Sequence, residues 1–132
     1  MNHSDWLAQV NEEILDPELP ICDPHHHLWD HPGSRYLLDE LLQDTNSGHN
    51  IVSTVFVECN SMYRKSDDLK IAPVGETEFV QGIAAMSASG QYGDIRVAAG
   101  IVSFADLTLG SAVRDVLSAH KTASVNRFKG IR

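Results

Sequence analysis

The stretch ICDPHHHLW, residues 21–29, places a carboxylate and three imidazoles at the end of a short apolar run. In an extended chain, successive side chains point to opposite faces, so His25 and His27 share one face while His26 points away. Neutral imidazole is a common ligand for zinc and other divalent metals, and two such groups supply half of a tetrahedral shell. We therefore interpret His25 and His27 as candidate metal ligands or catalytic groups. A chance cluster of histidines on a surface loop is the alternative.

The neighbours of this histidine pair have their own expected roles. Asp23 is expected to join the metal shell, or to accept a hydrogen bond from a histidine ring and so fix its tautomer. Pro24 suits the last residue of a strand because it donates no backbone hydrogen bond. Cys22 and Cys59 adjoin apolar runs, and we expect both to be reduced, buried small hydrophobes. A ligand role for Cys22 is the alternative.

The pattern Asp-x-His-x-His followed by Leu28 and Trp29 resembles the first strand of the amidohydrolase-related family. This is the branch of the amidohydrolase superfamily that contains sugar-acid and dicarboxylate lactonases. Two later stretches, TVFVE at 54–58 and FKGIR at 128–132, resemble the second and fourth strands of that branch in the same order. The resemblance implies an α/β fold in which residues 20–132 form strands one to four of a (β/α)₈ TIM-type barrel, preceded by a helical arm over residues 1–19.

The length of the chain bears on that expectation. A complete barrel of this type needs roughly 250 residues, whereas the chain has 132. We therefore expect a fragment, inactive by itself, from a larger hydrolase. A half-barrel that pairs with a second copy as a homo-oligomer is the alternative.

The resemblance also implies a chemistry. In this family the first-strand histidines lie at the barrel mouth beside a histidine and an aspartate from later strands, and that aspartate activates water for attack on an ester or lactone carbonyl. His25 and His27 would bind a divalent metal, zinc being expected, or would polarise the carbonyl directly, since some lactonases of this branch work without metal. Arg132 would bind a substrate carboxylate or the developing oxyanion; a solvated terminal residue is the alternative.

Three functions therefore compete. The first is a hydrolase that opens a lactone or ester of a small carboxylated or sugar-derived substrate. The second is a metal-dependent decarboxylase or hydratase of the same superfamily. The third is a non-enzymatic half-barrel whose histidines bind metal for structure or assembly.

A fourth candidate site residue, Glu58, follows the apolar, β-branched run at residues 51–57. Catalytic groups of barrel enzymes lie at the carboxyl ends of strands, whereas a structural glutamate is usually solvated on a helix. We predict that Glu58 reaches the pocket, as a metal ligand or as a hydrogen-bond partner of a histidine or of substrate. The residues that follow, to about 74, are expected to form a lid or substrate wall.

Strand-like and helical patterns alternate along the chain, as in βαβ folds. Ser4 is expected to cap the first helix, His31 to lie in an exposed turn-rich loop, Asp106 to cap a helix or touch substrate, and His120 to be a favourable charge at a helix terminus. Strands are expected at residues 19–23, 51–57, 95–102 and 127–132, and helices at residues 5–15, 36–46, 76–89 and 109–120.

Composition narrows the class of partner. The formal net charge is −8 and the sequence pI about 5.2, which argues against nucleic acid or anionic membrane as the main partner because both attract basic patches. No apolar run approaches the roughly 20 residues that span a bilayer, and the N-terminus lacks the order of a signal peptide. We expect a cytoplasmic protein that acts on a small molecule.

Overall fold

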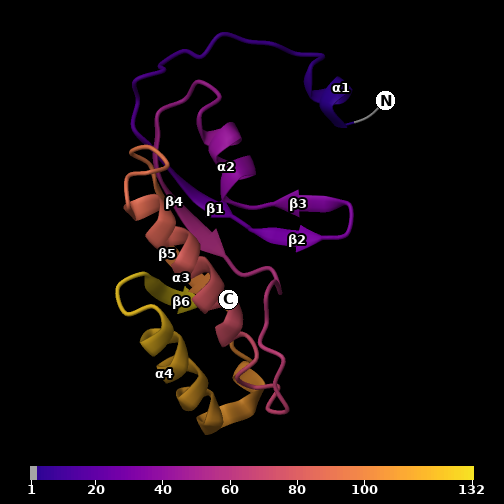
Figure 1. The fold of residues 1–132 in the computed structure, drawn as a ribbon, viewed down its shortest axis with the longest axis vertical. Coiled ribbons are helices and arrows are strands. Elements are labelled where there is room, and N and C mark those ends of the chain that lie inside the picture. The colour runs from indigo at the N-terminus through magenta and orange to yellow at the C-terminus, as the bar shows by residue number, and fades with distance from the viewer. Residues whose placement is uncertain (1–2) are drawn as a thin grey trace.

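The computed structural model describes residues 3–132 and has an α/β fold (Figure 1). It contains a four-stranded sheet, a separate two-stranded hairpin, and helices that alternate with the strands along the chain. Their bounds are α1 His3–Leu7, β1 Ile21–His26, β2 Trp29–His31, β3 Ser34–Tyr36, α2 Leu38–Thr45, β4 Ile51–Val57, α3 Val74–Ala88, β5 Arg96–Ser103, the 3₁₀ helix η1 Leu107–Ala112, α4 Val113–Ala123 and β6 Phe128–Ile131. None of the helices over residues 3–132 is both long enough and apolar enough to span a membrane.

The main sheet has the strand order β1-β4-β5-β6, which is also the order along the chain, and every neighbouring pair is parallel. The alternation of strands and helices predicted this arrangement, which the structure confirms at the level of an α/β fold with a parallel sheet. Because all four strands run the same way, their carboxyl ends meet at one edge of the sheet. That edge brings together the residues that follow β1, β4 and β6.

The apolar core lies between the sheet and its helices. Phe56 and Ile101 from the sheet meet Leu41 of α2 and Val80 of α3, and all four are almost fully buried. Helices α3 and α4 lie side by side in Figure 1. Burying one large apolar side chain stabilises the fold by about 1.5–3 kcal/mol, so this core holds the strands whose ends carry the candidate site.

The predictions for the first half of the chain are correct for β4, whose bounds match residues 51–57, and wrong for the arm. Helix α1 ends at Leu7, not at residue 15, and Ser4 lies within it rather than before it. Trp6, Val10 and Leu15 are largely exposed. Helical spacing stabilises a helix only where its apolar face is buried. Here Ile14 is partly buried beside Gly48, whereas Trp6 and Val10 are exposed.

The expected loop after Trp29 is instead the antiparallel hairpin β2–β3. Trp29 stacks on Tyr36 across the two strands, and the turn at Gly33 uses a φ of 79° that glycine adopts without steric cost. His31 ends β2 and is exposed, as expected.

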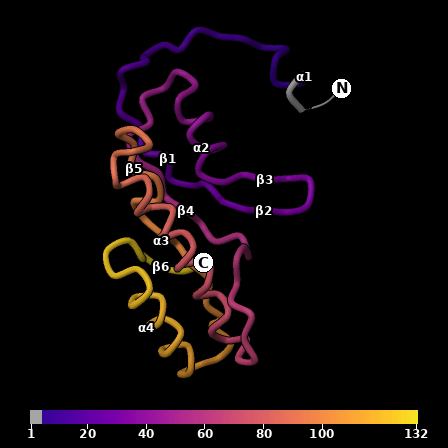
Figure 2. The backbone as a smooth tube through the Cα atoms, viewed as in Figure 1, coloured from indigo at the N-terminus to yellow at the C-terminus, as the bar shows by residue number. Residues whose placement is uncertain are grey.

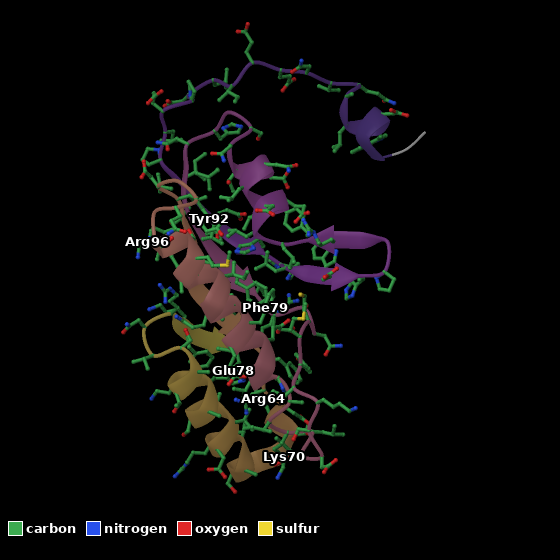
Figure 3. All side chains as sticks on the ribbon, viewed as in Figure 1. Arg64, Lys70, Glu78, Phe79, Tyr92 and Arg96 are labelled. Atoms are coloured by element: carbon green, nitrogen blue, oxygen red, sulfur yellow. The ribbon has the colours of Figure 1, made fainter. Side chains whose placement is uncertain are left out.

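The long connection from β4 to α3, whose path Figure 2 shows, contacts the residues at the start of α3, and the backbone nitrogen of Arg64 donates to the backbone oxygen of Ala72 at 2.9 Å. A Cβ at Gly75 would lie 2.6 Å from both the backbone nitrogen of Arg64 and the backbone oxygen of Met62. Arg64 also pairs with Glu78 of α3, its Nε donating to Oε2 at 2.9 Å (Figure 3). The connection is therefore anchored to the helix rather than free of it.

Two further expectations are wrong. His120 is not a terminal charge but is fully buried, where Nε2 donates to the Phe104 carbonyl (2.9 Å) and Nδ1 accepts from the Thr77 hydroxyl (2.8 Å). Burial lowers the pKa of His120, which opposes a positive charge there. Cys22, expected to be buried, is exposed.

Candidate functional site

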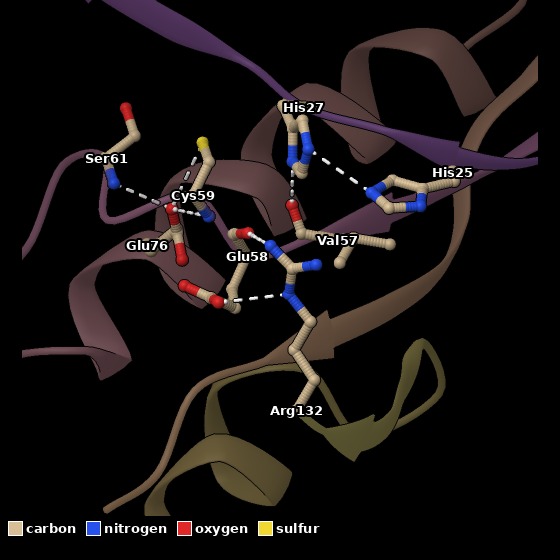
Figure 4. Close-up of polar contacts among 8 residues, drawn as sticks. All are labelled: His25, His27, Val57, Glu58, Cys59, Ser61, Glu76 and Arg132. Carbon is tan, nitrogen blue, oxygen red and sulfur yellow. Dashed lines mark hydrogen bonds and ion pairs between the residues drawn. The ribbon is translucent and has the colours of Figure 1, made fainter.

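His25 and His27 lie at the carboxyl end of β1 with their rings edge to face and their centroids 4.8 Å apart. Their Nε2 atoms approach to 3.2 Å (Figure 4). The alternation of an extended chain brings the two rings to one face, as predicted. The two Nε2 atoms therefore face each other at the carboxyl end of β1.

A backbone contact fixes the tautomer of His27. Nδ1 of His27 lies 2.7 Å from the carbonyl oxygen of Val57, at the end of β4. A carbonyl only accepts, so Nδ1 carries the proton and a neutral ring keeps its lone pair on Nε2. A metal ion or a hydrogen-bond donor can bind Nε2 only in this tautomer. The neighbouring strand β4 sets it through Val57.

His26 points to the opposite face and has a structural role. It is 7% exposed, and its Nδ1 donates to the backbone oxygen of His27 at 3.4 Å. Its Nε2 accepts from the hydroxyl of Thr54 at 2.9 Å, and that hydroxyl in turn accepts from the backbone nitrogen of Ala98. Burial lowers the pKa of His26. The chain of contacts ties β1, β4 and β5 together directly behind the exposed pair.

Glu58 and Arg132 meet at the same edge of the sheet. Arg132 Nε donates to Oε1 of Glu58 at 3.1 Å, and Arg132 Nη2 donates to the backbone oxygen of Glu58 at 3.2 Å. The Glu58 side chain is only 15% exposed, whereas that of Arg132 is 52% exposed. Arg132 thus presents donors to solvent while one carboxylate holds it in place. All four sequence-predicted site residues lie around the ends of β1, β4 and β6 (Figure 4).

Sequence reasoning missed a further carboxyl group beside this site. Glu76 lies in the first turn of α3 and is 1% exposed. Its Oε1 accepts from the backbone nitrogens of Cys59 at 3.1 Å and Ser61 at 2.7 Å. The signal was present in the sequence, because α3 is apolar around most of its circumference and such a helix is buried on more than one side.

The expected partners of the histidine pair are placed differently. Asp23 Oδ1 accepts from the backbone nitrogen of His25 at 3.1 Å, so this carboxylate shapes the turn after β1.

Asp106 caps η1, as expected, by accepting from the backbone nitrogen of Thr108. A cavity of about 390 Å³ lies between β1 and α2, away from the histidine pair, and is lined by Ile21, Cys22, Asp23, Pro24, Tyr36, Leu41, Asp44, Thr45 and Ile51.

The fit of the pair to a metal ion can be judged from its geometry and donors. Two nitrogens bound tetrahedrally at 2.0–2.1 Å are separated by roughly 3.3 Å, close to the observed 3.2 Å between the Nε2 atoms. Within the described part of the chain, however, no group of three or more His, Cys, Asp or Glu side chains is arranged to hold an ion. The pair fits two ligand positions, and the remaining ligands would have to come from elsewhere.

Comparisons of the chain with protein-family models, curated proteins and solved structures gave no match. The functional argument therefore depends on the site itself. Its chemistry is that of two directed imidazole nitrogens, a shielded carboxylate and a half-exposed guanidinium at one edge of a parallel sheet. Such a set can bind an anion, polarise a carbonyl or contribute two ligands to a cation.

Proposed function

We propose that the chain is the strand-one-to-four portion of a (β/α)₈ hydrolase that opens a lactone or ester of a small carboxylated or sugar-derived substrate. The observation that carries the proposal is the meeting of the directed His25–His27 pair with the half-exposed Arg132 at the carboxyl edge of the sheet. In barrel enzymes this edge holds the reacting groups.

The sheet topology supports the barrel part of the proposal. A doubly wound sheet reverses its strand order at a switch point, where its ligands bind. Here the order β1-β4-β5-β6 runs in one direction with every pair parallel. Right-handed crossovers in such an order place the helices on one face, which leaves the other face for the interior of a barrel.

The histidine pair would contact the carbonyl end of the substrate. Because Val57 fixes the tautomer of His27, its Nε2 is available as a ligand or, once protonated, as a donor to the carbonyl oxygen. A divalent metal held by His25 and His27 would lower the pKa of bound water to about 7 and polarise the carbonyl. Without a metal, His25 and a protonated His27 would donate hydrogen bonds from these two nitrogens to the developing oxyanion.

Arg132 would bind the substrate carboxylate. Its guanidinium has five donors, of which Nε and Nη2 contact Glu58. The half-exposed remainder can form charge-assisted bonds to a second carboxylate, the geometry that arginine favours. Glu58 stops the guanidinium from swinging into solvent, so the proposed role of Glu58 is to orient Arg132 rather than to attack substrate.

The test is an assay of the protein expressed in the full reading frame that encodes this chain, against a panel of lactones with and without a free carboxylate. Bound metal is quantified before and after dialysis against a chelator. We expect hydrolysis, with carboxylated lactones preferred. Activity that survives chelation assigns the histidines as donors, and activity lost with the metal assigns them as ligands. No hydrolysis of any lactone or ester overturns the proposal.

A further inference from the structure

The peptide group between Glu58 and Cys59 is held from both sides. Its oxygen accepts from Nη2 of Arg132 at 3.2 Å, and its N–H donates to Oε1 of Glu76 at 3.1 Å. The oxygen and hydrogen of a trans peptide point in opposite directions, so Arg132 and Glu76 lie on opposite sides of one planar unit. Figure 4 shows this arrangement. Hydrogen bonds in such a series polarise one another.

The turn that follows needs this support. Asn60 has a φ of 62° and Met62 a φ of 54°, both in the left-handed region that non-glycine residues seldom adopt. Glu76 Oε1 accepts from the residues on either side of Asn60, Cys59 and Ser61. Left-handed residues persist where the surrounding contacts over-determine them. The two bonds to one oxygen therefore fix the path of the chain immediately after Glu58.

We propose that Glu76 is a positioning residue that holds the 58–59 peptide, and through it sets the orientation of Arg132 at the carboxyl edge of the sheet. The inference concerns the geometry of the site, and the proposed hydrolase activity gives that geometry its purpose.

The buried carboxyl group of Glu76 interacts with the titratable groups of Glu58, Cys59 and Tyr63. Glu76 Oε2 is buried without a hydrogen-bond partner in the described structure. Burial raises the pKa of Glu76, and the neighbouring Glu58 carboxylate raises it further. Cys59 and Tyr63 are the other titratable groups around it, and the pKa of each is raised in part by Glu76. The hydrogen bonds from the backbone nitrogens of Ser61 and Cys59 act in the opposite direction and lower the pKa of Glu76. Glutamine would keep the same acceptor.

The proposal is tested by amide hydrogen exchange, read residue by residue by NMR on the 132-residue chain and on its variants, together with the Nε–H resonance of Arg132. In the wild type, the amides of Cys59 and Ser61 should be protected. In Glu76→Ala, both should exchange about tenfold faster or more, and the Arg132 resonance should shift. In Glu76→Gln, protection and the Arg132 resonance should both return to the wild-type values.

Asp115→Ala is the control, because Asp115 is also an acid in the first turn of a helix, α4, but is exposed. It should leave Cys59, Ser61 and Arg132 unchanged. Unprotected Cys59 and Ser61 amides in the wild type would overturn the proposal even if Glu76→Ala fails to fold. So would a Glu76→Gln protein whose two amides exchange at unprotected rates, or a folded Glu76→Ala protein with an unshifted Arg132 resonance. None of these readouts requires turnover, so failure of the lactone assay leaves them intact.

Discussion

Nε2 of His25 and Nε2 of His27 lie 3.2 Å apart at the carboxyl end of β1, while the ring of His26 between them is buried on the opposite face. Nδ1 of His27 donates to the Val57 carbonyl, which leaves the lone pair of the neutral His27 ring on Nε2. Of the three consecutive histidines, the first and third thus face the candidate site and the middle one is part of the fold. Variants can therefore change the exposed histidine pair without changing the buried contacts of His26, or the reverse.

Thr54 holds the structural side of this arrangement. Its hydroxyl donates to His26 and accepts from the backbone nitrogen of Ala98. Thr54→Val leaves both partners buried and unpaired, so we expect a loss of about 1–3 kcal/mol in the free energy of unfolding, measured by urea denaturation. Thr122→Val, at an exposed position of α4, is the control and should change it far less. Equal effects of the two variants would contradict the assigned role of Thr54.

The pH dependence of stability should contain a histidine component. Burial lowers the pKa of His120 below the ordinary histidine value of about 6.5. Between that lowered value and 6.5, the unfolded state binds more protons than the folded state, so the free energy of unfolding rises with pH through this window. Below the folded pKa this contribution is lost. His120→Gln should flatten the slope between pH 5 and pH 7 in urea unfolding experiments. A slope as steep as that of the wild type would show that His120 is not held neutral.

Arg132 should matter for function more than for stability. Its pairing with Glu58 is half-exposed, and exposed pairs contribute at most about 1 kcal/mol. Losing a hydrogen bond to a charged group costs about 1.5–3 kcal/mol, which corresponds to a loss in kcat/KM of roughly 10- to 150-fold. Arg132→Ala is therefore expected to reduce lactone hydrolysis by that factor while the urea midpoint moves little. Arg114→Ala, an exposed residue of α4, is the control. A variant with normal turnover would remove Arg132 from the site.

Two glycines of α3 provide a matched pair. A Cβ at Gly75 would lie 2.6 Å from two backbone atoms of the connection, whereas at Gly82 nothing lies within 4 Å. Gly75→Ala should destabilise the protein by about 1–3 kcal/mol through overpacking. Gly82→Ala should stabilise it by about 0.5–1 kcal/mol because alanine favours the helix. Thermal unfolding of both variants measures the difference, and effects of the same sign would mean that the connection does not pack on α3.

The parts of the fold that were predictable are those governed by local patterns. The β-branched run at residues 51–57 became β4 with the expected bounds, since a strand covered on both faces has a continuous apolar sequence. The pairing of His25 with His27 followed from alternation along one strand. The helix predicted at residues 5–15 was wrong because the spacing of Trp6 and Val10 does not indicate whether another surface covers them.

The parts that were not predictable depend on contacts between distant segments. The position of His120 in the last turn of a helix predicted a charged side chain. Its burial, however, is decided by the packing of α4 on α3. Glu76 is the first residue of the helix predicted at residues 76–89, but its bonds to Cys59 and Ser61 depend on how the intervening connection returns to the helix. No local pattern encodes that path.

The most direct test of the central claim compares lactone hydrolysis by His27→Ala and His31→Ala in the full reading frame, with bound metal quantified in each. Nε2 of His27 faces Nε2 of His25 at the carboxyl end of β1, whereas His31 is exposed on the hairpin. We predict that His27→Ala lowers turnover by about 10²-fold or more while His31→Ala retains wild-type turnover. Wild-type turnover in His27→Ala would contradict the assignment of the histidine pair as the reacting centre.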